Sequence, residues 1–389
     1  MLSHSPPAGP SPLRSLQVGL EWFPERPGGL NRVFYDLAHH LPAMGVDFTG
    51  LVTGSDQVVH ASGGRVVSVC PTAAPLPVRC WKFRRHVAAR MKERYSLVAA
   101  HFALNAFPAL DLLDGCPLVF HFHGPWALEA EREGAGWLGA RLRRALEQTV
   151  YRHAALSITL SRAFARVLES AYGIPSDRIR VVPGGIDLAQ FTELPSRDEA
   201  RRLLGWPGDR PIVLAVRRLV RRMGLEDLIA AADVVRQRRQ DVMLLIAGGG
   251  ALHAELNAQI QARGLDGQVR LLGRLPDSEL PLAYRAADAT VVPTVALEGF
   301  GLIAVESLAA GTPVLVTPVG GLPEVVSGLS PALVLEATGP VAIADGLVRA
   351  LRGELALPSA EACRQYAREH YDCRQAVSRI ADVYREVAA

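Results

Sequence analysis

Two glutamates on one short segment are the residues of this chain best placed to do chemistry together. Glu298 stands just ahead of Gly299 and Gly301, an apolar helical pattern follows, and Glu306 comes eight positions after Glu298. At about 1.5 Å rise per residue, a helix places these carboxylates roughly 12 Å apart, about the span from the sugar of a nucleotide-sugar to its ribose. The free N–H groups at the helix start suit a diphosphate between them. The segment predicts a site for both ends of an activated sugar.

The elements that must position this segment alternate between apolar runs and helical patterns, which is typical of parallel sheets built from βαβ units. The fold class we predict is therefore α/β. Strands are expected at 16–20, 46–52, 97–101, 118–121 and 155–160 in the first half, and at 211–216, 242–247, 269–272, 289–293 and 314–317 in the second. The main helices are expected at 31–44, 138–152, 225–237 and 372–387.

At 389 residues the chain is too long for one ordinary core and suits two domains. The apolar pattern weakens between Asp187 and Pro195, so we place the boundary there. We predict a disordered tail at 1–13, a first domain at 14–190, a second at 191–371 and a separate final helix at 372–389. Ligands of such sheets bind where the carboxyl ends of the strands face a cleft.

Bulk composition excludes several classes of protein. Hydrophobic residues make up 49% of the chain and charged residues 21%, as in globular proteins, and no run of eighteen apolar residues suggests a membrane span. The net charge of +3 is too small to imply nucleic-acid binding. Five scattered cysteines without a C-x-x-C pair favour free thiols over disulfides or a zinc site. We expect a cytoplasmic protein.

Polar residues at expected strand ends are further candidates. Gly28 and Gly29 follow the first strand and open a helix, so their backbone can approach a phosphate or sugar closely. His121 and His123 end a strand on the same side of it, so one of them can bond a sugar hydroxyl, and a metal site is an alternative. The third possibility is a histidine satisfied within a turn.

Four arginines lie within six positions after the first strand of the second domain: Arg217, Arg218, Arg221 and Arg222. Loss of a nucleoside diphosphate develops negative charge that cations stabilise. A solvated loop is the alternative interpretation of this cluster.

These motifs together resemble the retaining glycosyltransferases of family 4, and the resemblance runs from Gly28 to the last helix. It implies the GT-B fold, in which two Rossmann-like parallel-sheet domains face a cleft and the last helix crosses back to the first domain. The first domain would bind the acceptor and the second the nucleotide-sugar.

The resemblance also implies roles. Glu298 would bond hydroxyls of the donor sugar, Glu306 would take both ribose hydroxyls, and His123 would contact the donor sugar. The catalytic set is His123, Arg218 and Glu298. The donor-binding set is Gly28, Gly29, Arg222, Gly248, Gly249, Arg274, Gly299, Phe300, Gly301, Leu302, Ile303 and Glu306. His101, also at a strand end, is a candidate acceptor contact.

This chain departs twice from the family pattern Gly-Arg-Leu, three variable residues, Lys-Gly. Arg217 replaces the glycine and Met223 replaces the lysine. Because methionine cannot stabilise a phosphate, either Arg222 or Arg221 supplies the second cation, or the site operates with one cation fewer.

The function that follows from the resemblance is retaining transfer of a sugar from a nucleotide-diphosphate-sugar to a hydroxyl of a glycan, glycolipid or small molecule. A UDP-sugar is the favoured donor and GDP-mannose the next. No D-x-D pair occurs, so the sequence requires no metal and no other cofactor. The alternatives are a non-catalytic nucleotide-sugar-binding partner subunit and a nucleotide-sugar epimerase on the same fold.

Two other enzyme classes fit poorly. A pyridoxal-phosphate phosphorylase needs a lysine in its second domain, and this chain has none there. An NAD-dependent dehydrogenase would want a third fingerprint glycine where His253 stands.

A basic stretch at 79–94, with Trp81 and Phe83 interleaved, suggests peripheral contact with the inner face of a membrane through an amphipathic helix. The alternative is a solvated helix face whose two aromatic residues belong to the core.

Overall fold

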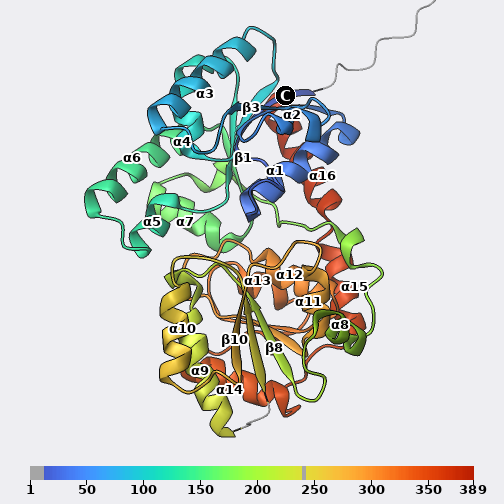
Figure 1. The fold of residues 1–389 in the computed structure, drawn as a ribbon. Helices are drawn as coiled ribbons and strands as arrows, with labels where there is room; N and C mark the ends of the chain where they lie inside the picture. Colours follow the sequence, from blue (N-terminus) through green and yellow to red (C-terminus); the bar gives the residue numbers. More distant parts are fainter. Residues whose placement is uncertain (1–12, 239–241) are drawn as a thin grey trace, which may run out of the picture.

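Two parallel sheets, one in each half of the chain, organise the computed structural model, which describes residues 13–238 and 242–389 (Figure 1). The first sheet has the order β3-β2-β1-β4-β5-β6-β7. Its strands are β1 (Leu13–Glu21), β2 (Val46–Thr53), β3 (Val66–Cys70), β4 (Leu97–Ala100), β5 (Leu118–Phe122), β6 (Leu156–Thr159) and β7 (Ile179–Val181). In register, Leu16 lies between Thr49 of β2 and Val98 of β4.

The second sheet has the order β10-β9-β8-β11-β12. Its strands are β8 (Ile212–Val216), β9 (Met243–Ala247), β10 (Val269–Gly273), β11 (Ala289–Val292) and β12 (Val314–Val316). Strands such as β9 and β12 are buried along their whole length. Helices cover both faces, which is why these strands read as continuous apolar runs without alternation.

Helices connect successive strands and pack on the sheets. The first domain contains α1 (Gly29–His40), α2 (Gln57–Ala61), α3 (Leu76–Arg90), α4 (Ala103–Ala106), α5 (Trp126–Arg132), α6 (Trp137–His153) and α7 (Arg162–Tyr172). The second contains α8 (Arg197–Leu204), α9 (Leu225–Arg238), α10 (His253–Ala262), α11 (Leu280–Ala286), α12 (Leu302–Ala309), α13 (Leu322–Val326), α14 (Pro340–Leu351) and α15 (Ala360–His370).

The last helix, α16 (Cys373–Ala388), returns to the first domain (Figure 1). Asp372 caps its start by accepting a hydrogen bond from the backbone N–H of Arg374, as a good N-cap residue does. Val377 and Ile380 pack with apolar residues of the first sheet and its helices, among them Leu37 and Val119. The predicted GT-B arrangement, including this return, is confirmed.

Local differences from the expected elements have simple causes. The structure adds β3, whose short apolar run lies at the sheet edge, and begins β1 at Leu13, the last residue assigned to the tail; the rest of that tail lies outside the described residues. The helix expected to run to residue 44 stops at His40, and a 3-10 turn with Pro42 near its start continues to Met44.

Helix α3 forms within the basic stretch and divides its two aromatic residues. Phe83 is fully buried, whereas Trp81 is 54% exposed and Arg85 lies over its ring at 5.4 Å from the centroid. The interpretation that both aromatics belong to the core is therefore wrong for Trp81. Among the described residues no helix is long and apolar enough to cross a membrane.

Candidate donor site between the two domains

The carboxyl ends of strands in both sheets border a cleft of about 820 Å³ between the domains. Every residue predicted to bind the donor or to act in catalysis lines it, and so does His101. The residues come from the loops after β1, β4, β5, β8, β9, β10 and β11 and from helices α1 and α12, because parallel strands bring the segments that follow them to one edge of a sheet. The structure thus gathers the predicted residues in one place, while their individual roles stay predictions.

The turn into α12 forms the floor of this cleft. Gly301 caps the helix in the left-handed conformation, with φ 87°, and a Cβ there would lie 2.5 Å from Leu322. Leu297, with φ 55°, is the one non-glycine residue of positive φ among the described residues. Strained turns of this kind persist where the surrounding structure holds them. Here Arg222 does so, donating from Nη1 to the Leu297 carbonyl at 2.9 Å.

Backbone donors at the start of α12 are free to meet a ligand. The N–H groups of Phe300, Gly301, Leu302 and Ile303 make no hydrogen bond to any described residue. Opposite them begins α1, where a Cβ on Gly29 would be only 3.8 Å from the Leu302 side chain. Two helix N-termini, one from each domain, therefore approach each other across the cleft. Their N–H groups and positive dipole ends favour an anion between them.

Glu298 sits at the mouth of α12 in an ion pair that its position in the sequence does not reveal. Nη2 of Arg217 donates hydrogen bonds both to Glu298 Oε2 and to the hydroxyl of Thr294. Burial alone would raise the pKa of Glu298, but the charge and hydrogen bond of Arg217, aided by Arg222 and Arg218, lower that pKa below its ordinary value. Glu298 is therefore held ionised and ready to accept from hydroxyl groups.

Glu306 lies further along α12 in a less polar setting. Tyr284 donates from its hydroxyl to Glu306 Oε2 at 2.8 Å, whereas no described residue bonds Oε1. Burial raises the pKa of Glu306, and the Tyr284 hydrogen bond and the charge of Arg32 oppose that rise only in part. One oxygen is thus anchored and the other is available to a ligand in the cleft.

The arginine loop after β8 divides its side chains between several tasks. Arg218 is exposed and makes no side-chain hydrogen bond to the described residues. Arg221 is 56% exposed and pairs with Glu226 and Glu255 at the rim. Arg222 is almost fully buried, with Nη2 3.0 Å from Glu129 of α5. Of the two arginines suggested as a second phosphate cation, one is turned to the rim and the other is engaged by a carboxylate.

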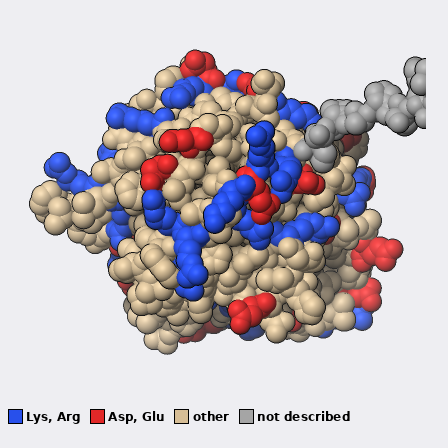
Figure 2. Space-filling view, turned by 90° about the horizontal axis from the view of Figure 1, so that it is seen from above, with Lys and Arg blue, Asp and Glu red and all other residues tan. Residues whose placement is uncertain are grey.

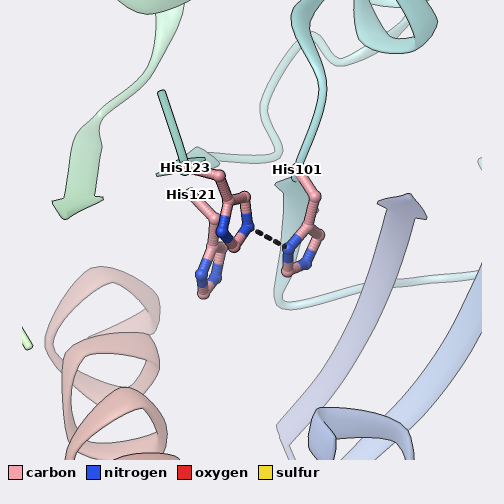
Figure 3. A group of neighbouring side chains, drawn as sticks. All are labelled: His101, His121 and His123. Carbon is pink, nitrogen blue, oxygen red and sulfur yellow. Dashed lines mark hydrogen bonds between the residues drawn. The ribbon is translucent and has the colours of Figure 1, made fainter. Parts of the chain in front are cut away.

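Three histidines form a cluster, of which His101 and His123 line the cleft (Figure 3). Nδ1 of His101 lies 3.2 Å from Nε2 of His123, and Nε2 of His101 lies 3.0 Å from Oε1 of Gln17. His121 contacts the hydroxyl of Tyr384, from α16, at 2.7 Å. Burial lowers the pKa of all three, to about 4 for His123, so they are neutral at pH 7.

The hydrogen bonds fix the tautomers of two of these rings. Ser15 donates to the carbonyl of Asp47, which can only accept, so the Ser15 oxygen accepts from Nε2 of Gln17. Gln17 therefore turns Oε1 toward His101, and Nε2 of His101 must carry the proton. Nδ1 of His101 then accepts from Nε2–H of His123. This leaves His123 with a lone pair on Nδ1 that no described residue uses.

A metal ion could in principle use these histidines, whose candidate ligand atoms lie within 4.8 Å of one another. Their rings, however, are nearly parallel, with 16° between His101 and His121 at a centroid distance of 4.2 Å. A nitrogen lone pair lies in the plane of its ring, so two stacked rings cannot point at one ion without turning. The hydrogen-bonded arrangement fits the observed ring orientations better than a metal site does.

Loops from the second sheet complete the side of the cleft that the second domain forms. Gly248 has φ 144°, and a Cβ there would stand 1.8 Å from the Arg217 carbonyl, so only glycine fits. Gly249 and Arg274 line the cleft beside it. Tight packing against the loop that carries Arg217 therefore accounts for the glycine at position 248.

Comparison with known proteins decides the family. The model for glycosyl transferases group 1 matches residues 196–370, and the model for Glycosyltransferase Family 4 matches residues 27–190. A D-inositol 3-phosphate glycosyltransferase of Corynebacterium urealyticum is 30% identical over 92% of this chain and 91% of its own length. A glycogen synthase of Mycobacterium tuberculosis is 31% identical over 96% and 94%. This chain belongs to the group 1 glycosyltransferases.

Solved structures agree on the fold. The sucrose-phosphate synthase of Thermosynechococcus elongatus superposes with a TM-score of 0.81 at 23% identity, covering 96% of this chain and 99% of that one. Anabaena Alr3699/HepE, solved in complex with UDP-glucose, gives 0.77 at 20% identity, covering 96% and 100%.

In this glycosyltransferase, Met223 stands at the lysine position of the family pattern, and the residues around it are apolar too. Met223 is 4% exposed and packs with Leu219, Leu225 and Leu228 beneath the cleft. Its side chain contributes to the helix–sheet core, so the departure from the family leaves no cation at this point.

Several residues of the glycosyltransferase site carry no signal in the sequence. Glu129, Tyr284 and Thr294 belong to no motif, and each becomes visible only through its partner: Arg222, Glu306 and Arg217 respectively. Gln17 gives a weak signal, because it is the polar residue within the short run 16–20 that is otherwise Leu, Val and Gly, and it is fully buried.

Proposed function

We propose that this glycosyltransferase transfers a hexosyl group, with retention of configuration, from a nucleoside-diphosphate sugar to a hydroxyl acceptor. The observation that carries the proposal is α12: an ionised carboxylate at its mouth, free N–H groups at its start, and a second carboxylate further along. Glu298 would accept from hydroxyls of the sugar, the N–H groups would hold the diphosphate, and Glu306 would accept from the ribose.

In the proposed reaction the acceptor oxygen bonds to the anomeric carbon on the face that the diphosphate leaves. The bond from that carbon to the phosphate oxygen breaks, and the acceptor proton passes to the departing diphosphate. Arg218 stabilises the charge that develops. Glu298 is a hydrogen-bond acceptor and forms no covalent intermediate. The proposal requires no metal or other cofactor, so added chelator should leave the rate unchanged.

A UDP-sugar is the donor we favour, with GDP-mannose next. The support is indirect: Anabaena Alr3699/HepE, which shares the fold, was solved with UDP-glucose. For the acceptor we propose a glycan, a glycolipid or a small molecule bound by the first domain. Several similar sequences are named D-inositol 3-phosphate glycosyltransferases, which keeps a small phosphorylated polyol among the acceptors to test.

The test is a panel of UDP-, GDP-, ADP- and dTDP-sugars, with thermal shift for binding and slow nucleotide release for turnover. A donor that both binds and releases its nucleotide supports the proposal and names base and sugar. Binding without release, even with acceptors added, favours a non-catalytic partner subunit. Conversion of the sugar while it stays on the nucleotide favours an epimerase. No binding by any donor would refute the proposed site.

We also propose that the first domain contacts an anionic membrane surface. The face that it contacts would be the one toward the reducing compartment, in which the free cysteine thiols of this chain persist. Exposed apolar side chains gather on α3 and α6: Leu76, Val78, Trp81, Trp137, Leu138 and Leu142. Arginines lie among them, with Arg141 over the Trp137 ring. Figure 2, which views the molecule from above, shows many Lys and Arg side chains on that face, with several Asp and Glu side chains among them. Aromatic and basic residues together suit a lipid interface.

Sedimentation with vesicles tests this contact. Binding to vesicles with anionic lipid, weakened by Trp137→Ala and Leu142→Ser, is expected. Equal binding by those variants, or none by the unaltered protein, would exclude the surface.

A further inference from the structure

We propose that Arg217 is the second cation of the donor site: it neutralises Glu298 while the cleft is empty and turns to the diphosphate when the donor binds. The inference rests on the proposed function and assigns a role to a residue that replaces a glycine of the family pattern.

The first step is the position of its charge. Arg217 follows β8 directly, and its side chain is 7% exposed, yet it lines the cleft. Its guanidinium reaches Glu298, three residues before the cap of α12, so it stands beside the free N–H groups expected to hold the diphosphate. Within the described part of the chain, no other arginine of the loop pairs with a carboxylate of the α12 turn.

The second step is the set of hydrogen-bonding groups that Arg217 leaves unused. Among the described residues only Nη2 of its three guanidinium nitrogens makes hydrogen bonds, to Glu298 and Thr294. Nε is buried and has no hydrogen-bond partner among the described residues. A buried donor without a partner lowers stability. An anionic ligand that draws the guanidinium into a new position can satisfy this donor, and this favours anion binding in the cleft.

The third step is elimination within the loop. Arg222 is compensated by Glu129, Arg221 is turned to the rim, and Met223 carries no charge. As far as the described residues show, Arg218 is then the one cation of the loop beside the cleft that pairs with no carboxylate. A diphosphate brings at least two negative charges, so a second guanidinium is needed, and Arg217 is the nearest. Guanidinium groups match phosphate oxygens with two donors at once.

Movement of Arg217 would also release Glu298. Oε2 of Glu298 accepts from Arg217 and, at 3.4 Å, from the hydroxyl of Thr294. When the guanidinium turns to the diphosphate, both carboxylate oxygens can accept from sugar hydroxyls. Binding of the diphosphate and binding of the sugar are thereby coupled through one side chain.

The experiment measures the affinity of the full chain for UDP, which carries no sugar, and for UMP. If the donor panel selects another base, the diphosphate and monophosphate of that nucleoside replace UDP and UMP. Arg217→Gly should weaken UDP binding at least about tenfold, the worth of a hydrogen bond to a charged group, and UMP binding much less. Arg221→Met removes a charge at the rim and should change neither affinity. Arg217→Gly combined with Met223→Lys, which restores the family pattern, should regain UDP affinity.

A residue that merely orients Glu298 gives a different result. Arg217→Gly would then leave UDP binding unchanged and weaken only binding of the UDP-sugar, which overturns the proposal. If Arg217→Gly does not fold, Arg217→Lys and Arg217→Met replace it. Arg217→Lys keeps a single point charge and should retain part of the UDP affinity. Unchanged UDP affinity in Arg217→Met would overturn the proposed role. Failure of the unaltered protein to bind any nucleoside diphosphate would refute the proposed function itself, and this inference with it.

Discussion

Arg222 and Glu129 join the two domains across the cleft: Nη2 of the arginine lies 3.0 Å from Oε2 of the glutamate. The arginine belongs to the loop after β8 and the glutamate to α5 of the first domain. Glu133, at the end of α5, lies 3.7 Å from Nε of the same arginine and accepts from the backbone N–H of Arg221. Arg222 therefore contacts both the first domain and the Leu297 turn at the mouth of α12.

Glu129→Gln should weaken closure, because the buried Arg222 charge loses a charged partner that contributes about 1.5–3 kcal/mol. We expect faster hydrogen exchange in α5 and in residues 221–224, and a larger radius of gyration by X-ray scattering. Glu131→Gln on the exposed side of the same helix is the control and should change neither. Unchanged exchange in the Glu129 variant would show that the pair does not hold the domains together.

Glu306→Ala should weaken nucleotide binding, since the ribose loses the carboxylate that we expect to accept its hydroxyls. The pKa of Glu306 is raised by burial, so the carboxylate protonates at a higher pH than an ordinary glutamate. Nucleotide affinity should therefore fall as the pH is lowered toward the ordinary glutamate range, and the fall should begin above it.

Tyr284→Phe sharpens this test. It removes the hydrogen bond that lowers the pKa of Glu306 and should move the loss of affinity to still higher pH. Titration calorimetry at several pH values measures both effects. Unchanged nucleotide affinity in Glu306→Ala would show that Glu306 does not bind the ribose.

Arg218→Ala should lower turnover more than donor affinity, because its charge matters most as the diphosphate leaves. We expect a loss in kcat on the order of a hundredfold, which corresponds to about 2.7 kcal/mol of transition-state stabilisation. Steady-state kinetics with the selected donor gives kcat and KM separately. A rise in KM with kcat unchanged would contradict the assigned role.

The histidine cluster should make the protein less stable in acid. The pKa of His123 is about 4 in the folded state, against about 6.5 unfolded. Between these values the unfolded chain binds a proton that the folded chain does not, so stability decreases as the pH falls from 6.5 to 4. The full window is worth about 3 kcal/mol for one such group.

Urea unfolding at pH 7.5 and pH 5.0 measures this contribution. Between the two pH values, the free energy of unfolding of His123→Asn should fall by about 2 kcal/mol less than that of the unaltered protein. His153→Asn, at an exposed position, should behave like the unaltered protein. An equal pH dependence in the His123 variant would show that this ring is not the titrating group.

The sequence alone determined the features whose causes are local. Strands covered on both faces must be continuously apolar, so the positions of most strands followed from their residues. The start of α12 at Gly301 is also local, because a glycine in the left-handed conformation and a helix start need only neighbouring residues, whereas Arg222 holds the preceding turn at Leu297 from a distant loop. The local pattern of residues is therefore enough to place Glu298 and Glu306 on one segment, at the mouth of a helix and within it.

Only the tertiary structure decided which charges meet. Arg217 reaches Glu298 across 81 positions, Arg222 reaches Glu129 from the other domain, and Tyr384 closes a hydrogen-bond network with Gln17 from the opposite end of the chain. Ion pairs and hydrogen bonds depend on distances of a few ångströms, and no local pattern encodes the distance between segments that lie far apart in the sequence. The sequence predicted a cluster of arginines after the first strand of the second domain. Their different surroundings became known only from the packing of the two domains.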